Sequence, residues 1–327
     1  MNRLLGPVVD LVLIVMLSAC HHRLAPPGDD ASELAAWRAE VGPPVIFAAA
    51  AGDVTAPITQ LIVVSWNVHV GGGRVVELVE WLRRRAAAGG LNAGFVLLLQ
   101  EAYRAGGEIP PHTPGARVPG TIRPVRPALD VTALGRYLRM SVAYFPSMRN
   151  GEGNPGAAGD DREDRGSAIL STDPMTDVEG IELPFGKQRR VAVAATITPR
   201  GALPALRVIA AHLDTISQGQ RRQADDLARR ITELRTSRPS LPLIVGVDAN
   251  AFFGTRDAVF KRLQTAVQLA PNCDTRSTAA FGRRLDFVFS TLDSSHIRSC
   301  ETLPEKYGSD HRPIVVTMAS AVLDELP

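Results

Sequence analysis

Short apolar segments rich in β-branched residues recur along most of the chain, and polar residues stand where these segments end. LIVVSWN ends at Asn67, FVLLLQE ends at Glu101, and LPLIVGVDAN ends at Asn250. Segments of this length and composition are typical of strands, and strands that are apolar at nearly every position are buried on both faces. The chain is therefore expected to form sheets that are covered on both sides.

Segments with helical periodicity lie between the predicted strands. Apolar residues recur at helical spacing from Val75 to Gly89 and over 219–236, and RDAVFKRLQTAV at 256–267 predicts a further helix. Residues 104–128 and 150–164 are rich in Pro and Gly and predict loops. Nothing resembling a linker interrupts residues 58–320, so we expect one α/β domain there, in which two sheets pack together under helices, and a tail at 321–327.

The composition is that of a globular protein. Of the 327 residues, 45% are apolar, which is enough to build a large core, and 21% are charged. The formal net charge is only +2. The protein as a whole therefore has no strong field that would draw it onto nucleic acid or anionic lipid.

The N-terminus reads as an export signal. Arg3 precedes an apolar run at 11–17, which is too short to span a bilayer and ends in LSAC at Cys20. This resembles a bacterial lipobox, although Asp10 departs from the pattern. We expect a signal peptide at 1–19, a lipidated Cys20 that anchors the protein to a membrane facing the periplasm or the exterior, and a Pro/Ala/Gly-rich tether at 20–57 with a short helix around Trp37. A plain signal peptide and an unprocessed anchor are the alternatives.

The two remaining cysteines are Cys273 and Cys300. An oxidising compartment would allow them to form a disulfide. Two separate buried thiols are an equally good interpretation of the sequence.

Polar residues at strand ends are the main candidates for a functional site. Any one of them is most simply a turn residue or a helix cap. Their recurrence at the ends of so many strands suggests instead that they meet in one pocket at the edge of the sheets. The residues concerned are Asn67, Glu101, His212, Asp214, Asp248, Asn250, Asp286, Asp310 and His311.

These residue types favour one kind of chemistry. Carboxylate and carboxamide oxygens suit Mg²⁺, with Mn²⁺ or Ca²⁺ as alternatives, and no cysteine stands among them to make a thiolate site. His212 and Asp214 form an HxD pair, but the chain lacks a full set of nitrogen ligands for zinc at matching spacing. A hard metal ion combined with imidazole groups fits phosphoryl chemistry.

The ordered set WN (66–67), QE (100–101), HLD (212–214), DAN (248–250), LD (285–286) and SDH (309–311) resembles the endonuclease/exonuclease/phosphatase family. The family includes deoxyribonuclease-like nucleases, neutral sphingomyelinases and inositol-polyphosphate phosphatases. The resemblance covers about residues 58–320. It implies a four-layer α/β/β/α sandwich of two mixed sheets flanked by helices, and a Mg²⁺-dependent phosphoesterase activity.

The resemblance also implies a metal site. Glu101 resembles the principal Mg²⁺ ligand of the family, with Asn67 beside it and Asp310 near the metal. Arg190 stands before a strand, where either a phosphate contact or a solvated charge would fit.

Catalytic roles carry over to five residues. Asp248 resembles the carboxylate that orients or activates water, and Asn250 resembles the carboxamide that steadies the pentacoordinate phosphorus. His311 resembles the imidazole that faces the scissile phosphate, and Asp286 the partner that holds it. His212 resembles the second imidazole of the deoxyribonuclease-like and sphingomyelinase-like branches.

Some positions depart from the family pattern. GVDAN stands where GDFN or GDLN is common, and Ser167 stands where an amide is common, which weakens the expectation of a phosphate contact there. His69 fits a contact at the edge of the site and a loop histidine equally well.

The substrate is the least constrained part of the prediction. A nuclease or other phosphodiesterase acting on DNA or RNA is the first hypothesis, although the sequence shows no basic stripe with interleaved aromatic residues. A lipid headgroup or small phosphoester is the alternative, although no exposed aromatic hairpin is evident and only 5% of the residues are aromatic. An inactive binding protein of this fold is a third possibility. We expect a monomer.

Overall fold

The computed structural model of the chain describes residues 30–49, 56–111, 113, 129–150, 162–201, 203–215 and 217–319. The predicted signal peptide, Cys20 and the tail at 321–327 lie outside these residues. None of the helices in the described part is long and apolar enough to cross a membrane.

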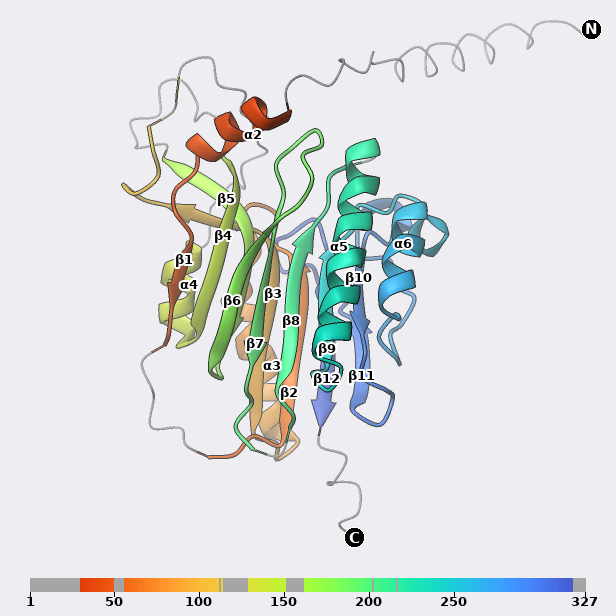
Figure 1. The fold of residues 1–327 in the computed structure, drawn as a ribbon. Helices are drawn as coiled ribbons and strands as arrows, with labels where there is room; N and C mark the ends of the chain where they lie inside the picture. The colour runs from red at the N-terminus through yellow and green to blue at the C-terminus, as the bar shows by residue number, and fades with distance from the viewer. Residues whose placement is uncertain are drawn as a thin grey trace, which may run out of the picture.

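Two sheets form the centre of the domain (Figure 1). The strands of the seven-stranded sheet are, in spatial order, β1 (Val45–Phe47), β4 (Ser141–Arg149), β5 (Glu163–Ser171), β3 (Ala93–Ala105), β2 (Gln60–Asn67), β12 (Ile314–Ala319) and β11 (Ile297–Thr302). Those of the five-stranded sheet are β10 (Asp286–Ser290), β9 (Leu243–Asp248), β8 (Leu206–His212), β7 (Val191–Ile197) and β6 (Met175–Glu182). The pairs β2–β3 and β8–β9 are parallel, so both sheets are mixed.

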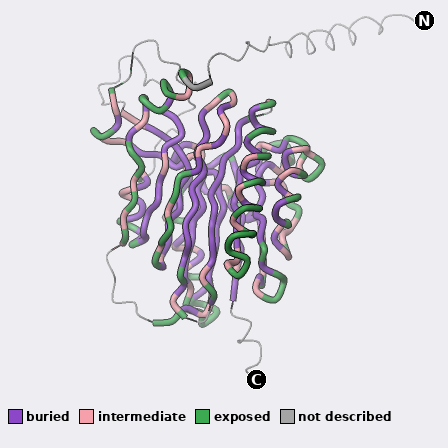
Figure 2. Tube along the Cα trace, viewed as in Figure 1, coloured by how far each residue is buried: buried purple, intermediate pink, exposed green. Residues whose placement is uncertain are grey.

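Helices cover the outer face of each sheet. Figure 1 shows α5 (Gln218–Ser237) and α6 (Ala258–Ala266) in front of the five-stranded sheet, and α3 (Val75–Ala88) and α4 (Val131–Leu138) behind the seven-stranded one. The central strands between them are buried along nearly their whole length, whereas the edge strands β1, β6 and β11 are partly exposed (Figure 2). The fold is thus the expected α/β sandwich of two mixed sheets flanked by helices.

The sheets approach each other closely near the ends of β2 and β9. A Cβ atom at Gly246 of β9 would lie 2.5 Å from Ser65 Oγ and 3.0 Å from Leu98 Cδ1 of the facing sheet. Glycine is therefore required here, because any side chain would push the sheets apart. This contact explains the glycine in GVDAN, and it holds Asp248 and Asn67 within reach of each other.

The folded unit begins earlier in the chain than expected. Helix α2 (Asp30–Ala39) contains the predicted helix around Trp37, and this indole is buried against Phe185, with 5.8 Å between the ring centroids. Strand β1 pairs with β4 at the edge of the seven-stranded sheet. A tether over all of 20–57 is therefore wrong for residues 30–47, because burial of Trp37 and strand pairing hold that part to the domain.

Cys273 and Cys300 are joined by a disulfide. It links the connection that follows α6 to β11, and Asp286 lies between the two cysteines in the sequence.

Candidate active site

Neighbouring strands bring the polar strand ends into one row. In the five-stranded sheet His212 is the register partner of Asp248, and Asp248 is the partner of Asp286. From the facing sheet come Asn67, at the end of β2, and His311, just before β12. The sequence prediction that these residues meet at one sheet edge agrees with the geometry.

Asp248 lies at the centre of the group. Its Oδ2 atom accepts a hydrogen bond from Asn67 Nδ2 at 2.8 Å and lies 3.4 Å from His212 Nε2 and 4.0 Å from His311 Nε2. Burial and the neighbouring charge of Asp286 raise the pKa of Asp248 to about 7. This carboxylate can therefore exchange a proton near neutral pH.

His311 is held by Asp286. Its Nδ1 atom lies 2.7 Å from Asp286 Oδ2. Burial alone would lower the pKa of His311, but Asp286 and Asp248 outweigh it and raise that pKa to about 10. The His311 amide also donates to Ser309 Oγ, which in turn donates to the carbonyl of Asn67. His311 is therefore a fixed cation at neutral pH.

The pKa of His212 is shifted in the opposite direction. Burial, and then the positive charge of Arg190, lower the pKa of His212 well below its usual value. Arg190 Nη1 lies 3.1 Å from His212 Nδ1, and because a guanidinium can only donate, Nδ1 must be the accepting nitrogen. Nε2 lies 3.4 Å from Asp248 Oδ2 and 3.2 Å from Asn250 Nδ2, and we assign to it the proton of the neutral ring, directed at the Asp248 carboxylate.

Asn250 is positioned by backbone contacts around the turn after β9. Its φ is 47°, its amide donates to Asp248 Oδ1 at 3.0 Å, and its Nδ2 donates to the carbonyl of Leu213 at 2.9 Å. Gln220 on α5 fixes the turn by donating to the carbonyls of Ala249 and Asn250. Gln220 did not stand out in the sequence, because it acts through backbone groups.

Glu101 sits at an irregularity in β3. The register with β5 shifts between Leu99 and Ala102, and Glu101 has a φ of 53°. Within the described part of the chain, no hydrogen-bond donor contacts its carboxylate, and His212 Nδ1 lies 3.9 Å from Glu101 Oε1. This β-bulge turns the Glu101 side chain toward the site, where its carboxylate oxygens can bind a ligand.

Asp310 lies at the outer margin of the site. Its side chain is 57% exposed, and Oδ1 lies 3.8 Å from His69 Nδ1. His69 is half-buried and has a φ of 48°, just after Asn67. His69 is thus a residue of the site edge, in contact with one of the predicted ligands.

One group of described residues brings possible metal ligands close together. Asp248, Asp286 and His311 place one ligand atom each within 4.8 Å of one another. In that set, however, His311 Nδ1 and Asp286 Oδ2 already share a hydrogen bond, and a cationic imidazole does not ligate a metal. The carboxylates of Glu101 and Asp310 are of the kind that Mg²⁺ prefers, whereas the Asn67 oxygen already accepts a hydrogen bond from the His69 amide at 2.9 Å.

Arg165 is a site residue that the sequence did not suggest. It lines a small hollow together with Glu101, Ser167, Arg190 and His212. Arg165 and Arg190 are both buried, the Nε atom of each lacks a hydrogen-bond partner, and neither is ion-paired to a carboxylate of the described residues. A buried guanidinium without a counter-ion is costly, so this hollow is built for an anion. The alternative of a solvated charge for Arg190 is wrong, because Arg190 is buried.

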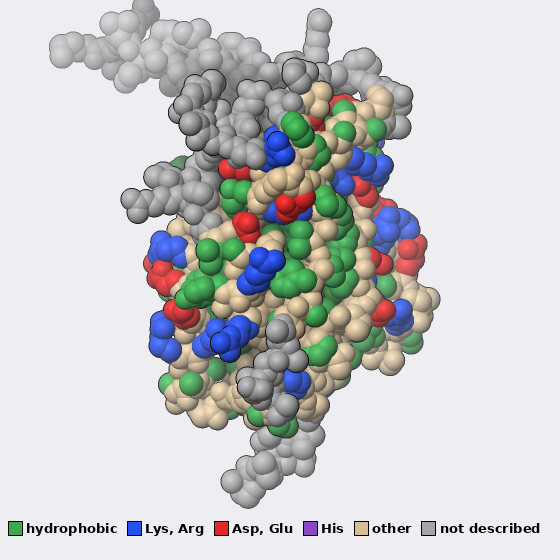
Figure 3. Space-filling view, turned by 90° about the vertical axis from the view of Figure 1, so that its left-hand side faces the viewer, with side chains coloured by type: hydrophobic (Ala, Val, Ile, Leu, Met, Phe, Trp, Pro, Cys, Tyr) green, Lys and Arg blue, Asp and Glu red, His purple; other side chains and the backbone are tan. Residues whose placement is uncertain are grey.

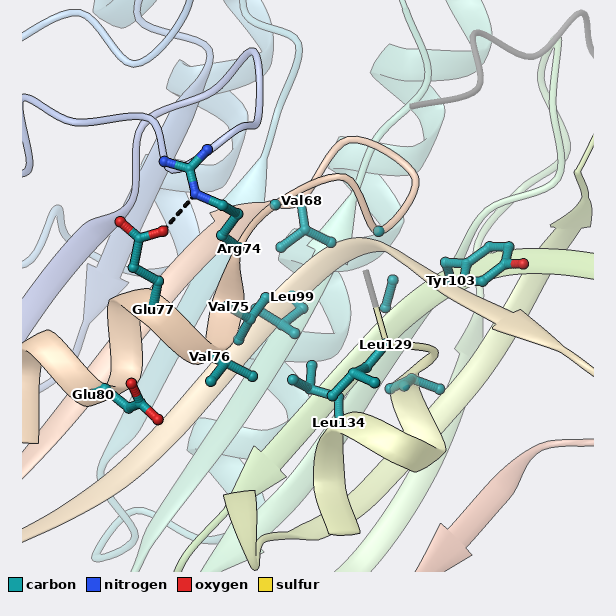
Figure 4. A pocket seen from close by; sticks show the side chains of 14 residues that line it. Val68, Arg74, Val75, Val76, Glu77, Glu80, Leu99, Tyr103, Leu129 and Leu134 are labelled. Atoms are coloured by element: carbon teal, nitrogen blue, oxygen red, sulfur yellow. Dashed lines mark hydrogen bonds and ion pairs between the residues drawn. The ribbon is translucent and has the colours of Figure 1, made fainter. Parts of the chain in front are cut away.

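A second cavity, lined by described residues, lies elsewhere. It has a volume of about 350 Å³ and lies between α3, α4 and β3, behind the loop that follows β2 (Figure 4). Val68, Leu99 and Leu134 line it, and its charged groups are mainly those of Arg74 and Glu77, which are hydrogen-bonded to each other at the rim. Its apolar walls do not suit a phosphate group.

Residues 64–311 match the family model described as the Endonuclease/Exonuclease/phosphatase family. No curated protein matches the chain significantly.

Similar solved structures share the fold at low sequence identity. The human Nocturnin catalytic domain with bound sulfate anion is 16% identical, with a TM-score of 0.52 over 85% of this chain and 97% of that one. An endonuclease/exonuclease/phosphatase from Beutenbergia cavernae is 19% identical, with a TM-score of 0.52 over 80% of this chain and 72% of that one. A family protein from Leptotrichia buccalis is 15% identical, with a TM-score of 0.52 over 80% and 100% of the two chains.

Proposed function

The chain belongs to the endonuclease/exonuclease/phosphatase family, and we propose that it is a Mg²⁺-dependent phosphodiesterase that hydrolyses nucleic acid by in-line attack of water. Members of this family hydrolyse phosphoester bonds. The proposal adds the kind of ester, the metal and the roles of this chain's residues.

The arrangement around Asp248 is the observation that carries the proposal. A carboxylate with a pKa of about 7 lies between a cationic and a neutral imidazole, both within 4.0 Å of its Oδ2 atom. Groups whose pKa values are driven apart in this way are typical of acid–base sites. A structural ion pair would not need the second, neutral histidine.

Each residue has a defined task in the proposed reaction. Asp248 accepts a proton from the attacking water, while Asn67 and the Asn250 amide hold its two oxygens in place. The His311 cation, oriented by Asp286, stabilises the charge that develops on the phosphorane oxygens. His212 keeps its Nε2 proton available for the opposite side of the same phosphate.

Glu101, Asn67 and Asp310 would hold the metal ion. A bound divalent cation neutralises phosphate oxygens and the developing charge on the leaving oxygen. Arg165 and Arg190 supply further positive charge on the side of His212, so that the phosphate is contacted by cations from two directions.

Nucleic acid is the first candidate substrate because the paired histidines resemble those of the deoxyribonuclease-like branch, which shares this feature with the sphingomyelinase-like branch. Attraction over a long distance is not expected to contribute much, since the net charge is +2 and acidic and basic side chains are interspersed on the face shown in Figure 3. A phospholipid headgroup is the second candidate. The observation that favours it is the LSAC sequence at 17–20, which would anchor the exported enzyme to a membrane surface.

Nicking of supercoiled plasmid tests the proposal. The purified chain with Mg²⁺ should convert supercoiled to open-circular DNA, and both EDTA and the substitution His311→Ala should abolish this. A folded protein that leaves plasmid and oligonucleotides intact, yet releases phosphocholine from mixed micelles, would reject the nuclease in favour of the lipid hydrolase.

A further inference from the structure

Three phenylalanines lie exposed on the two loops that lead into the active site. Phe252 and Phe253, 43% and 66% exposed, lie two and three residues after Asn250. Phe281 is 93% exposed and occupies the tip of the short helix Ala280–Gly282 with a φ of 56°. Exposing so much aromatic surface is costly in water, and among the described residues no other large apolar side chain is as exposed as Phe281.

Arg283 connects these rings. Its guanidinium carbon lies 5.2 Å from the ring centre of Phe252 and 5.4 Å from that of Phe281. Phe252 and Phe253 also contact each other, with 5.3 Å between their centroids. Phe252, Phe253, Phe281 and Arg283 therefore form one surface of π faces and positive charge, which we call the aromatic platform.

Hydrogen bonds fix the platform next to the catalytic residues. The amide of Ala249, one residue after Asp248, donates to the carbonyl of Leu285 at 3.0 Å, which ties the two loops together. Thr278 Oγ1 accepts from the amides of Leu285 and Asp286 at 3.0 and 3.2 Å. A phosphate held between His212 and His311 would thus have its neighbouring nucleoside within reach of the platform.

The chemistry of the platform favours nucleobases over a bilayer. Inserting Phe252 and Phe281 into hydrocarbon would drag the Arg283 guanidinium in with them, at a large cost in desolvation. A base that stacks on a ring leaves the guanidinium in water, where it can also reach a phosphate.

We propose that the aromatic platform stacks unpaired bases beside the scissile phosphate, so that the enzyme prefers single strands, including the transiently unpaired regions of supercoiled DNA, to paired duplex. In a duplex the bases stack on one another and are not available to protein rings. This inference rests on the proposed function, and it goes further by naming the substrate class and the residues that select it.

Binding of matched strands tests the inference without cleavage. The full chain carrying Asp248→Asn, in mild detergent with Mg²⁺, would be titrated into a fluorescent 12-nucleotide oligo(dA) strand and into an abasic strand of equal length, with fluorescence anisotropy as the readout. The oligo(dA) strand should bind about tenfold more tightly than the abasic strand, because the two differ only in their bases. Phe281→Ala should remove this preference and leave binding of the abasic strand unchanged.

Conservative variants separate stacking from simple apolar contact. Phe281→Trp should retain the preference for bases, whereas Phe281→Leu should lose it. Tyr137→Ala is the matched control, since Tyr137 is 61% exposed on α4, away from the platform loops, and should change nothing.

Equal affinity for the two strands in the starting protein, or an unchanged preference in Phe281→Ala, would overturn the inference. Cleavage of DNA by the wild-type chain would in that case leave the proposed function standing. Base-dependent binding by a wild-type chain that never cleaves would instead support the platform and reject the proposed function.

Discussion

Two histidines flank the carboxylate of Asp248, and their surroundings drive them into opposite charge states. On one side, Asp286 and Asp248 raise the pKa of His311 to about 10. On the other side, burial and Arg190 lower the pKa of His212 well below its usual value. The two rings are the same residue type at the same sheet edge, so only their partners distinguish them.

This difference assigns a separate task to each side of the site. A fixed imidazolium suits the stabilisation of negative charge, whereas a neutral imidazole can donate and accept protons without repelling a nearby metal ion or guanidinium. The partners come from neighbouring strands, so the roles are set by strand register and could not follow from residue type alone.

Loss of the Asp248 carboxylate or of the cationic His311 ring should have the largest effect on the rate of hydrolysis. Asp248→Asn and His311→Ala are each expected to lower the rate of DNA hydrolysis by about 10³-fold or more, because the base or the stabilising cation is removed. Single-turnover cleavage of an oligonucleotide measures this, with circular dichroism as the folding control. A His311→Ala enzyme that keeps its rate within tenfold of the wild-type rate would contradict a separate role for the cationic histidine.

Removing the neutral histidine, His212, should lower the rate of hydrolysis less. His212→Ala is expected to lower the rate by about 10²-fold, because a neutral hydrogen-bonding group contributes less than a fixed charge does. The same single-turnover assay measures the change. A larger loss of rate in His212→Ala than in His311→Ala would contradict the roles assigned to the two histidines.

The pH dependence should shift when Asp286 loses its charge. Asp286 raises the pKa of both Asp248 and His311, so Asp286→Asn should lower both. In the wild type, activity should fall as the pH drops through about 7, when Asp248 is protonated, and His311 should stay cationic up to a pH of about 10. In the variant both limits should move to lower pH, so that the rate falls about tenfold more at pH 9 than at pH 6.

A pH–rate profile of the two enzymes measures this shift. A variant that is slower by the same factor at every pH would show that Asp286 orients His311 without tuning its charge.

The smallest effect is expected at the anion-binding hollow. Arg165→Met should raise KM for an oligonucleotide about tenfold and leave kcat within a few-fold of wild type, because Arg165 binds phosphate without touching the reacting atoms. Arg162→Met, at a half-buried position three residues earlier and outside the hollow, is the matched control. An Arg165→Met variant with unchanged KM and a lower kcat would show that Arg165 acts on the reacting atoms instead.

Most of the fold and the membership of the site were predictable from the sequence. Strands such as β2 and β9 are apolar at almost every position, so burial on both faces and a polar end could be read directly from the residues. Since carboxyl ends of parallel strands meet at one edge, the meeting of Asn67, His212 and Asp248 followed.

The sequence was uninformative where function depends on contacts between distant segments. Arg165 looks like any charged residue before a strand, and its burial beside Glu101 emerges only from the register of β3 with β5. The aromatic platform was missed because Phe252 and Phe281 are 29 positions apart and are connected in space by Arg283. Strand β1 was missed because a three-residue strand carries no periodicity.

The measurement that tests the central claim most directly is an NMR titration of the histidine side chains in the metal-free wild-type chain. The chain has 7 histidines, so His212→Gln and His311→Gln variants would identify the two signals. The account predicts that His311 loses its proton only near a pH of about 10, while His212 is still neutral at pH 6. Two rings that both titrate near the ordinary pKa of about 6.5 would contradict it.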